Sequence, residues 1–219
     1  MARIVFDLDG TLIDSEHDIG GVANKTLEAR GLEPITMAQT RAFVGNGASV
    51  FIDKMRAVRG IDQSEHDALL AEFITHYETA VELTEIYPGV VAALTDLRAK
   101  GHRLGICTNK PIKPTLAVVR HLNLESYFDT ILGGDSLPVR KPDLAHLQKA
   151  FDDLGTGARL YVGDSDVDAA TATALGVPFL LFTEGYRKVP VAELAHDRAF
   201  SNFDELGALI EDVMPANEV

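Results

Sequence analysis

Ile4-Val5-Phe6-Asp7-Leu8-Asp9-Gly10-Thr11-Leu12 is the stretch that decides how this chain is organised. The apolar run at its start is typical of a buried strand, and the carboxylates and glycine that follow end the strand. From Tyr87 onward, short apolar segments alternate with helical patterns of about 10–15 residues, which indicates a parallel sheet covered on both faces. We therefore predict an α/β fold with a Rossmann-like, doubly wound parallel sheet.

The stretch between residues 14 and 85 has a different, helical pattern. Its breaks contain Gly31 and Pro34, and then Gly45-Asn46-Gly47. This predicts a small all-helical cap domain at 14–85, inserted into an α/β catalytic core of residues 1–13 and 86–219. The helices expected in the cap span 17–30, 36–44, 48–60 and 64–83. In the core we expect strands at 103–108, 130–132, 160–162 and 179–182, helices at 90–100, 113–122, 143–154 and 166–175, and a looser acidic tail.

Composition narrows the function classes. Twenty Lys and Arg against 33 Asp and Glu give a net charge of −13, the opposite of what a nucleic-acid or anionic-membrane binder normally carries. No apolar run approaches the roughly 20 residues of a membrane span, and no signal peptide is recognisable at the start. One cysteine excludes an internal disulfide framework, and the histidines lack metal-binding spacing. We expect a cytoplasmic protein whose metal ligands, if any, are oxygens.

Acidic residues mark the strand ends of the predicted core. Asp7 and Asp9 follow the first strand, and Asp164 and Asp168 follow the strand at 160–162. Active sites of open parallel sheets lie beyond the carboxyl ends of the strands, so these four carboxylates should converge. They would repel each other unless a dication joined them, and oxygen-only ligands favour Mg²⁺.

The remaining strand-end residues suit a phosphoryl group. Asp7 and Asp9 can divide two roles between them. A metal-bound carboxylate stays ionised and can act as a nucleophile, and its neighbour can hold a proton and serve as acid and then as base. Thr108 offers a hydroxyl, and the backbone of Thr108 and Asn109 offers N–H groups for phosphate oxygens. Lys141 offers a positive charge for the phosphoryl group and the attacking carboxylate.

Four ordered segments resemble the motifs of haloacid dehalogenase-like hydrolases, and the resemblance covers essentially the whole chain. It implies that Asp7 is the nucleophile, that Asp9 is the acid/base, and that Asp7, the Asp9 carbonyl and Asp164 hold Mg²⁺. Asp168 is either a further ligand or a residue that holds Lys141 or a metal-bound water. The four segments are Asp7-Leu8-Asp9-Gly10-Thr11-Leu12, Thr108-Asn109, Lys141-Pro142 and Gly163-Asp164-Ser165-Asp166-Val167-Asp168.

Two further segments look like those of the phosphoglycolate phosphatases within this superfamily. They are Phe43-Val44-Gly45-Asn46-Gly47-Ala48 and Gly133-Gly134-Asp135-Ser136-Leu137-Pro138. The resemblance implies hydrolysis of 2-phosphoglycolate to glycolate and phosphate through an aspartyl-phosphate. Leu144 departs from the pattern, since relatives often have proline there.

The cap is expected to recognise the carboxylate of such a substrate. Between Arg41 and Gly60 the only acid is Asp53, so this stretch has a net charge of +3. Gly45-Asn46-Gly47 opens a helix near Ala48, and free N–H groups at a helix start favour an anion. The expectation is that the Gly45–Ser49 turn, helped by Arg41 or Lys54, closes over the carboxylate.

Other functions stay open on the sequence alone. Within the same superfamily they are a pyrophosphatase, a nucleotide or sugar-phosphate phosphatase, and a phosphosugar mutase. Asp9 argues against a dehalogenase. A dehalogenase releases a halide rather than an alkoxide, so it has no leaving group to protonate, and the halide-releasing enzymes of this superfamily lack the second aspartate. A receiver module also uses strand-end acids with Mg²⁺, but its phosphoacceptor lies two strands after its acidic pair and it needs no cap. The expected partner is a small phosphorylated anion, and the protein is a monomer or a homodimer.

Overall fold

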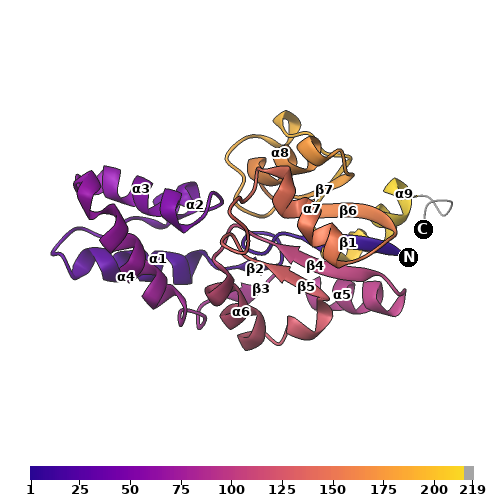
Figure 1. Cartoon of the computed structure of the whole chain (residues 1–219), viewed down its shortest axis with the longest axis horizontal. Helices are drawn as coiled ribbons and strands as arrows, with labels where there is room; N and C mark the ends of the chain where they lie inside the picture. The colour runs from indigo at the N-terminus through magenta and orange to yellow at the C-terminus, as the bar shows by residue number, and fades with distance from the viewer. Residues whose placement is uncertain (215–219) are drawn as a thin grey trace.

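A computed structural model describes residues 1–214 and shows an α/β core (Figure 1). Its sheet has six strands in the order β5-β4-β1-β6-β7-β8, all paired in parallel, so the α/β prediction is confirmed. β1 lies in the middle of the sheet, which places the residues after it at the centre of the strand-end edge. The strands are β1 (Ala2–Phe6), β4 (Arg103–Cys107), β5 (Thr130–Leu132), β6 (Ala158–Gly163), β7 (Phe179–Phe182) and β8 (Arg198–Phe200).

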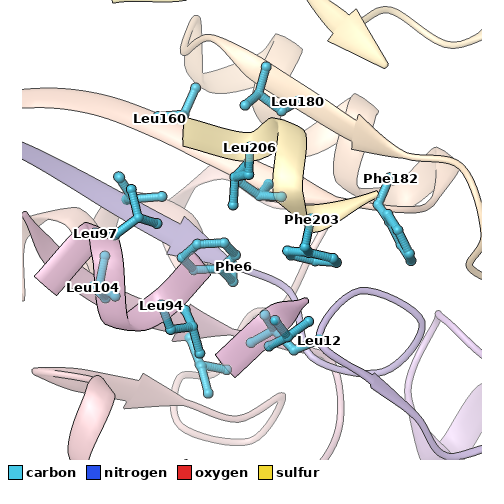
Figure 2. Close-up of a cluster of buried hydrophobic side chains, with 14 of the residues drawn as sticks. Phe6, Leu12, Leu94, Leu97, Leu104, Leu160, Leu180, Phe182, Phe203 and Leu206 are labelled. Carbon is cyan, nitrogen blue, oxygen red and sulfur yellow. The ribbon is translucent and has the colours of Figure 1, made fainter. Parts of the chain in front are cut away.

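Helices cover both faces of this sheet. The alternation of β1 sends Ile4 and Phe6 to one face and Val5 to the other. The first face packs against α5 (Val90–Ala99), α6 (Ile112–His121) and α9 (Leu206–Val213), and Figure 2 shows Phe6 among leucines and phenylalanines of this cluster. The second face packs against α7 (Leu144–Asp153) and α8 (Asp166–Leu175). Because both faces are buried, β7 and the Ile4-Val5-Phe6 part of β1 are continuously apolar.

Four helices from the first third of the chain form a separate cluster at one end of the molecule (Figure 1). They are α1 (Glu16–Glu28), α2 (Met37–Phe43), α3 (Ala48–Arg59) and α4 (His66–Tyr77), and they enclose their own apolar core around Phe51, Ile52 and Phe73. An antiparallel ribbon of β2 (Ile13–Asp14) and β3 (Glu85–Ile86) joins this cluster to the sheet. The division into a cap at 14–85 and a core at 1–13 and 86–219 stays a prediction, and residues 215–219 lie outside the described residues.

The structure differs from the sequence expectations at several ends. The helix expected at 64–83 is shorter, since α4 ends at Tyr77 and a loop leads to β3. The tail expected to be irregular contains β8, which pairs with β7, and α9, whose Leu206 and Ile210 enter the core. None of the helices within residues 1–214 combines the length and the apolar character needed to cross a membrane. Single 3₁₀ turns lie at Gln63–Glu65, Glu125–Tyr127, Val191–Glu193 and Phe203–Glu205.

Candidate active site

The carboxylates of the site are brought together by adjacent parallel strands. Asp7 follows β1 and Asp164 follows β6, and the Asp7 backbone N–H donates to the Val162 carbonyl at 2.9 Å. Asp168 lies in the first turn of α8, where the Ser165 side chain accepts from the Asp168 N–H and caps the helix. Asp7, Asp164 and Asp168 each offer an oxygen within 4.8 Å of the others, and all three are buried.

Asp164 is held by a close-packed shell. Thr11 Oγ1 donates to Asp164 Oδ1 at 2.7 Å, and the Tyr186 N–H donates to Oδ2 at 2.6 Å. A Cβ on Gly10 or Gly185 would lie 2.6 or 2.3 Å from Asp164 Oδ2, so both positions require glycine. Burial, reinforced by the neighbouring carboxylates, raises the pKa of Asp164 well above its usual value. This carboxylate is therefore fixed in place and, in the protein without a cation, costly to ionise.

Lys141 is the buried counter-ion of the cluster. Its Nζ lies 2.7 Å from Asp168 Oδ1, 2.8 Å from the Tyr161 hydroxyl and 2.9 Å from Asp7 Oδ1. Burial lowers the pKa of Lys141, but Asp168 and Asp7 outweigh it and the pKa is raised above its usual value. Burial raises the pKa of Asp168, but the charge of Lys141 and the hydrogen bonds from Lys141, Ser165 and Tyr161 together outweigh it, so the pKa of Asp168 is lowered from its usual value. Asp168 is thus ionised and positions Lys141 beside Asp7.

Of the three buried carboxylates, Asp7 has the fewest hydrogen bonds to its side-chain oxygens. Burial raises its pKa to about 7, against the opposing effect of Lys141. Its Oδ1 is buried, and its close partner among residues 1–214 is the Lys141 ammonium, 2.9 Å away in an ion pair that leaves the oxygen without a well-formed hydrogen bond. Buried carboxylates that meet at one point, one of them short of a partner, are the oxygen donors that divalent cations bind. The acidic cluster therefore fits a divalent metal site.

Asp9 points to a different set of partners from Asp7. Its Oδ1 accepts from Ser15 Oγ at 2.6 Å and from Lys110 Nζ at 3.1 Å. Ser15 immediately precedes α1, so the start of the helical cluster contacts the residues that follow β1. Neither partner was among the residues selected from the sequence. Lys110 directly follows Thr108-Asn109, and that adjacency is the signal that could have identified it.

Thr108 and Asn109 follow β4, as expected, and both are buried. Asn109 Nδ2 donates to the carbonyls of Gly45 and Lys141, each at 3.0 Å. One amide therefore ties the turn before α3 to the segment that carries Lys141. The Gly133-Gly134 segment packs against the same loop, since a Cβ on Gly134 would lie 2.4 Å from the Asn109 carbonyl oxygen.

A cavity opens between these strand ends and the helical cluster. Asp7, Asp9, Thr108, Asn109 and Lys110 form its polar side. Its other walls are Ile19, Val44, Gly45, Gly47, Ala48, Phe51, Phe73, Tyr77 and Pro111. Several of the residues predicted from the sequence therefore line one cavity. Gly45 and Gly47, in the turn before α3, line it from the side of the helical cluster.

The basic residues expected to assist this turn lie elsewhere. Arg41 Nε forms an ion pair with Glu16 Oε2 at 2.7 Å, and about half of the Arg41 side chain is exposed. Lys54 is half-buried and does not line the cavity, and its Nζ donates to the Ala42 carbonyl at 3.3 Å. Asn46 lies between the two lining glycines, and its side chain is not among the cavity walls. The substrate-binding roles of these three residues stay predictions.

Two residues after β7 also join the two parts of the molecule and were not foreseen. Tyr186 donates its hydroxyl to Asp14 Oδ1 at 2.6 Å while its backbone holds Asp164. Lys188 Nζ donates to the Val44 carbonyl at 2.7 Å, beside the turn that contains Gly45. This segment therefore contacts the Asp164 carboxylate, the connecting ribbon and the turn before α3.

Comparisons with known proteins agree with this fold and site. The sequence model of the family described as haloacid dehalogenase-like hydrolase matches residues 4–182. A phosphoglycolate phosphatase of Cereibacter sphaeroides is 47% identical over 98% of this chain and 100% of its own length. One from Rhodobacter capsulatus is 44% identical over 95% of this chain and 96% of its own.

A solved structure from Haemophilus somnus, described as a predicted phosphoglycolate phosphatase, superimposes with a TM-score of 0.88 at 28% identity, covering 94% of this chain and 96% of that one. The fold and site are those of a hydrolase with an acidic, strand-end active site. The chain belongs to the haloacid dehalogenase-like hydrolases.

Proposed function

We propose that this enzyme is a Mg²⁺-dependent phosphomonoesterase that hydrolyses 2-phosphoglycolate to glycolate and phosphate. The observation that carries the proposal is the placement of Asp7 and Asp9 at one cavity, with Lys141 2.9 Å from the Asp7 carboxylate. The similarity to phosphoglycolate phosphatases over nearly the whole chain supports the substrate.

In the first step, Asp7 attacks the phosphorus of the substrate. A new bond forms between a carboxylate oxygen of Asp7 and phosphorus, and the bond between phosphorus and the ester oxygen of glycolate breaks. Lys141 lies where its charge can offset the negative charge that gathers around the attacking carboxylate and the phosphoryl oxygens. Thr108 and the backbone of Asn109 offer donors to the same oxygens.

Asp9 moves the proton in both steps. In its acid form it gives a proton to the departing ester oxygen, so that glycolate leaves as an alcohol. As a carboxylate it then removes a proton from the water that attacks phosphorus, which breaks the acyl-phosphate bond and returns Asp7. Ser15 and Lys110, both in contact with Asp9 Oδ1, hold its side chain in the cavity.

The proposed ligands of Mg²⁺ are the side chains of Asp7 and Asp164 and the carbonyl of Asp9, with Asp168 as a further ligand or a support. When bound, the ion would supply positive charge for the phosphoryl oxygens and would keep the Asp7 carboxylate ionised at neutral pH. The hydrogen bonds from Lys141 and Tyr161 to Asp168 Oδ1 favour the supporting role for Asp168.

Apolar cavity walls favour an organic ester over pyrophosphate. Ile19, Val44, Phe51 and Phe73 enclose the space beside Asp9, where the leaving group of a monoester would lie. Pyrophosphate would place a second phosphate with more negative charge against these side chains, whereas the leaving group of 2-phosphoglycolate brings a methylene and a single carboxylate charge. Nucleotide or sugar-phosphate hydrolysis and phosphosugar transfer remain the alternatives. We also propose a cytoplasmic location and a monomer or homodimer.

The test is a substrate screen with purified protein. Phosphate release is measured with Mg²⁺ from 2-phosphoglycolate, pyrophosphate, a nucleoside monophosphate and a hexose phosphate at matched concentrations. The proposal expects the highest kcat/KM for 2-phosphoglycolate, and loss of release when EDTA replaces Mg²⁺. A higher kcat/KM for any of the other three would replace the proposed substrate.

A further inference from the structure

Lys110 is a buried cation to which the proposed mechanism gives no contact with the substrate. Its side chain is 2% exposed, and its Nζ contacts Asp9 Oδ1 at 3.1 Å and the Tyr77 hydroxyl at the end of α4. The same Nζ lies 4.0 Å from the centre of the Tyr77 ring. Among residues 1–214, Lys110 is the one basic residue that lines the cavity. A buried ammonium with one carboxylate partner at the mouth of an apolar space has capacity for a further anion.

We infer that Lys110 binds the carboxylate of the substrate and thereby selects a phosphate ester that carries one. The inference rests on the proposed function and adds to it the residue that recognises the glycolate leaving group of the substrate. In phosphoglycolate the carboxyl carbon is two bonds from the ester oxygen. A residue that binds the carboxylate must therefore stand beside the residue that protonates that oxygen, and Lys110 stands beside Asp9.

A substrate carboxylate in the cavity would give the Lys110 ammonium a second anionic partner beside Asp9. The apolar walls formed by Ile19, Phe51 and Phe73 strengthen this charge pairing because they exclude water from around it. Tyr77 keeps the ammonium directed into the cavity from the side of the helical cluster.

Lys110 is better placed for this task than the basic residues of the helical cluster. Arg41 is occupied by Glu16, and Lys54 contacts the Ala42 carbonyl outside the cavity. Gly45 and Gly47 reach the cavity, so their backbone can close over the carboxylate while Lys110 supplies the charge. Recognition then depends on a residue of the core loop after β4 as well as on the turn before α3.

The test compares two substrates that differ only in the carboxylate. 2-Phosphoglycolate and 2-hydroxyethyl phosphate are assayed with Mg²⁺ for the parent enzyme, Lys110→Gln and Lys110→Arg. Removing the charge should lower the ratio of kcat/KM values, phosphoglycolate over hydroxyethyl phosphate, by about 10- to 100-fold, the range of a charge-assisted hydrogen bond. Lys110→Arg should recover part of the ratio. Glycolate should also inhibit Lys110→Gln more weakly, with inhibition by inorganic phosphate unchanged.

Lys113→Gln is the matched control. Lys113 lies one turn further along, is exposed, and pairs with Glu78 next to Tyr77, at 3.4 Å. The control removes one positive charge from the same contact region outside the cavity and should leave the ratio unchanged. Lys110→Met, with an unbranched apolar side chain, replaces Lys110→Gln if the latter does not fold.

Each failure has its own signature. A parent enzyme without preference for phosphoglycolate over hydroxyethyl phosphate contradicts both the proposed function and the role of Lys110. A parent preference that persists in Lys110→Gln contradicts the role of Lys110 alone. Equal losses on both substrates mean that Lys110 only supports Asp9, which also overturns the inference.

Discussion

In the protein without a bound cation, the buried Asp7 carboxylate should lower the free energy of unfolding. Its pKa is raised from 3.8 to about 7, so between these values the folded protein binds a proton that the unfolded chain has released. Stability contributed by the neutral form is therefore lost as pH rises through this window. Each pKa unit corresponds to about 1.4 kcal/mol. Asp7 therefore costs the folded protein about 4 kcal/mol at pH 8, where it is ionised in both states, and about 1–2 kcal/mol at pH 5, where the unfolded chain has released the proton and the folded protein mostly has not.

Asp7→Asn removes this cost while keeping the size of the side chain. We expect the variant to be more stable than the parent in EDTA, by about 2–4 kcal/mol at pH 8 and by less at pH 5, because the parent's Asp7 is then mostly protonated in the folded state. Urea unfolding followed by circular dichroism at the two pH values measures the difference. Mg²⁺ should narrow the gap at pH 8, since it stabilises the parent by binding to the ionised carboxylate.

The reasoning would be refuted by a variant that is less stable than the parent at pH 8 in EDTA. It would also be refuted by a gap that widens toward pH 5. Either result would mean that the ion pair with Lys141 outweighs the burial of Asp7, and that the cluster is stable without a cation. Lys149→Gln, which removes an exposed charge paired with Asp153, should change stability by less than about 1 kcal/mol and serves as a control.

Three further predictions concern the same strand-end edge. Asp164→Ala should weaken Mg²⁺ binding, whereas Asp9→Asn should retain much of the Mg²⁺ affinity, because only the backbone carbonyl of Asp9 is a proposed ligand. Calorimetric titration with Mg²⁺ measures both affinities, and equal binding by the two variants would contradict the ligand set. Gly185→Ala places a Cβ 2.2 Å from the Gly10 carbonyl oxygen, so we expect a loss of at least about 2 kcal/mol in stability and a matching loss of activity, seen in urea unfolding and phosphate release. Cys107, whose burial raises its pKa to about 12, should resist a thiol reagent in the native protein at pH 8 and react fully in urea; rapid labelling of the native protein would contradict its burial.

Local patterns account for the parts of the fold and site that the sequence predicted well. The strand before Asp7 is short and apolar and ends in residues that stop strands, so both its type and its end are encoded within a few positions. Because parallel strands end at one edge, the meeting of Asp7 and Asp164 follows from topology. The capping of α8 by Ser165 then fixes Asp168.

The residues that the sequence did not reveal depend on distant contacts. Arg198-Ala199-Phe200 has no strand pattern of its own and becomes β8 through pairing with β7. Lys110 faces Asp9 and Tyr77, which lies 33 positions earlier, so its role depends on how α4 meets the core. Arg41 was selected because charge gathers around it, but the packing of its helix directs it to Glu16.

The most direct test of the account is the rate of phosphate release from 2-phosphoglycolate, measured side by side for the parent enzyme and Asp7→Asn. We predict Mg²⁺-dependent turnover by the parent and a loss beyond about a thousandfold in the folded variant, because the nucleophile is gone. Near-normal release by a folded Asp7→Asn protein would contradict the covalent mechanism. A parent that releases no phosphate from 2-phosphoglycolate, but cleaves another phosphate compound, would contradict the substrate.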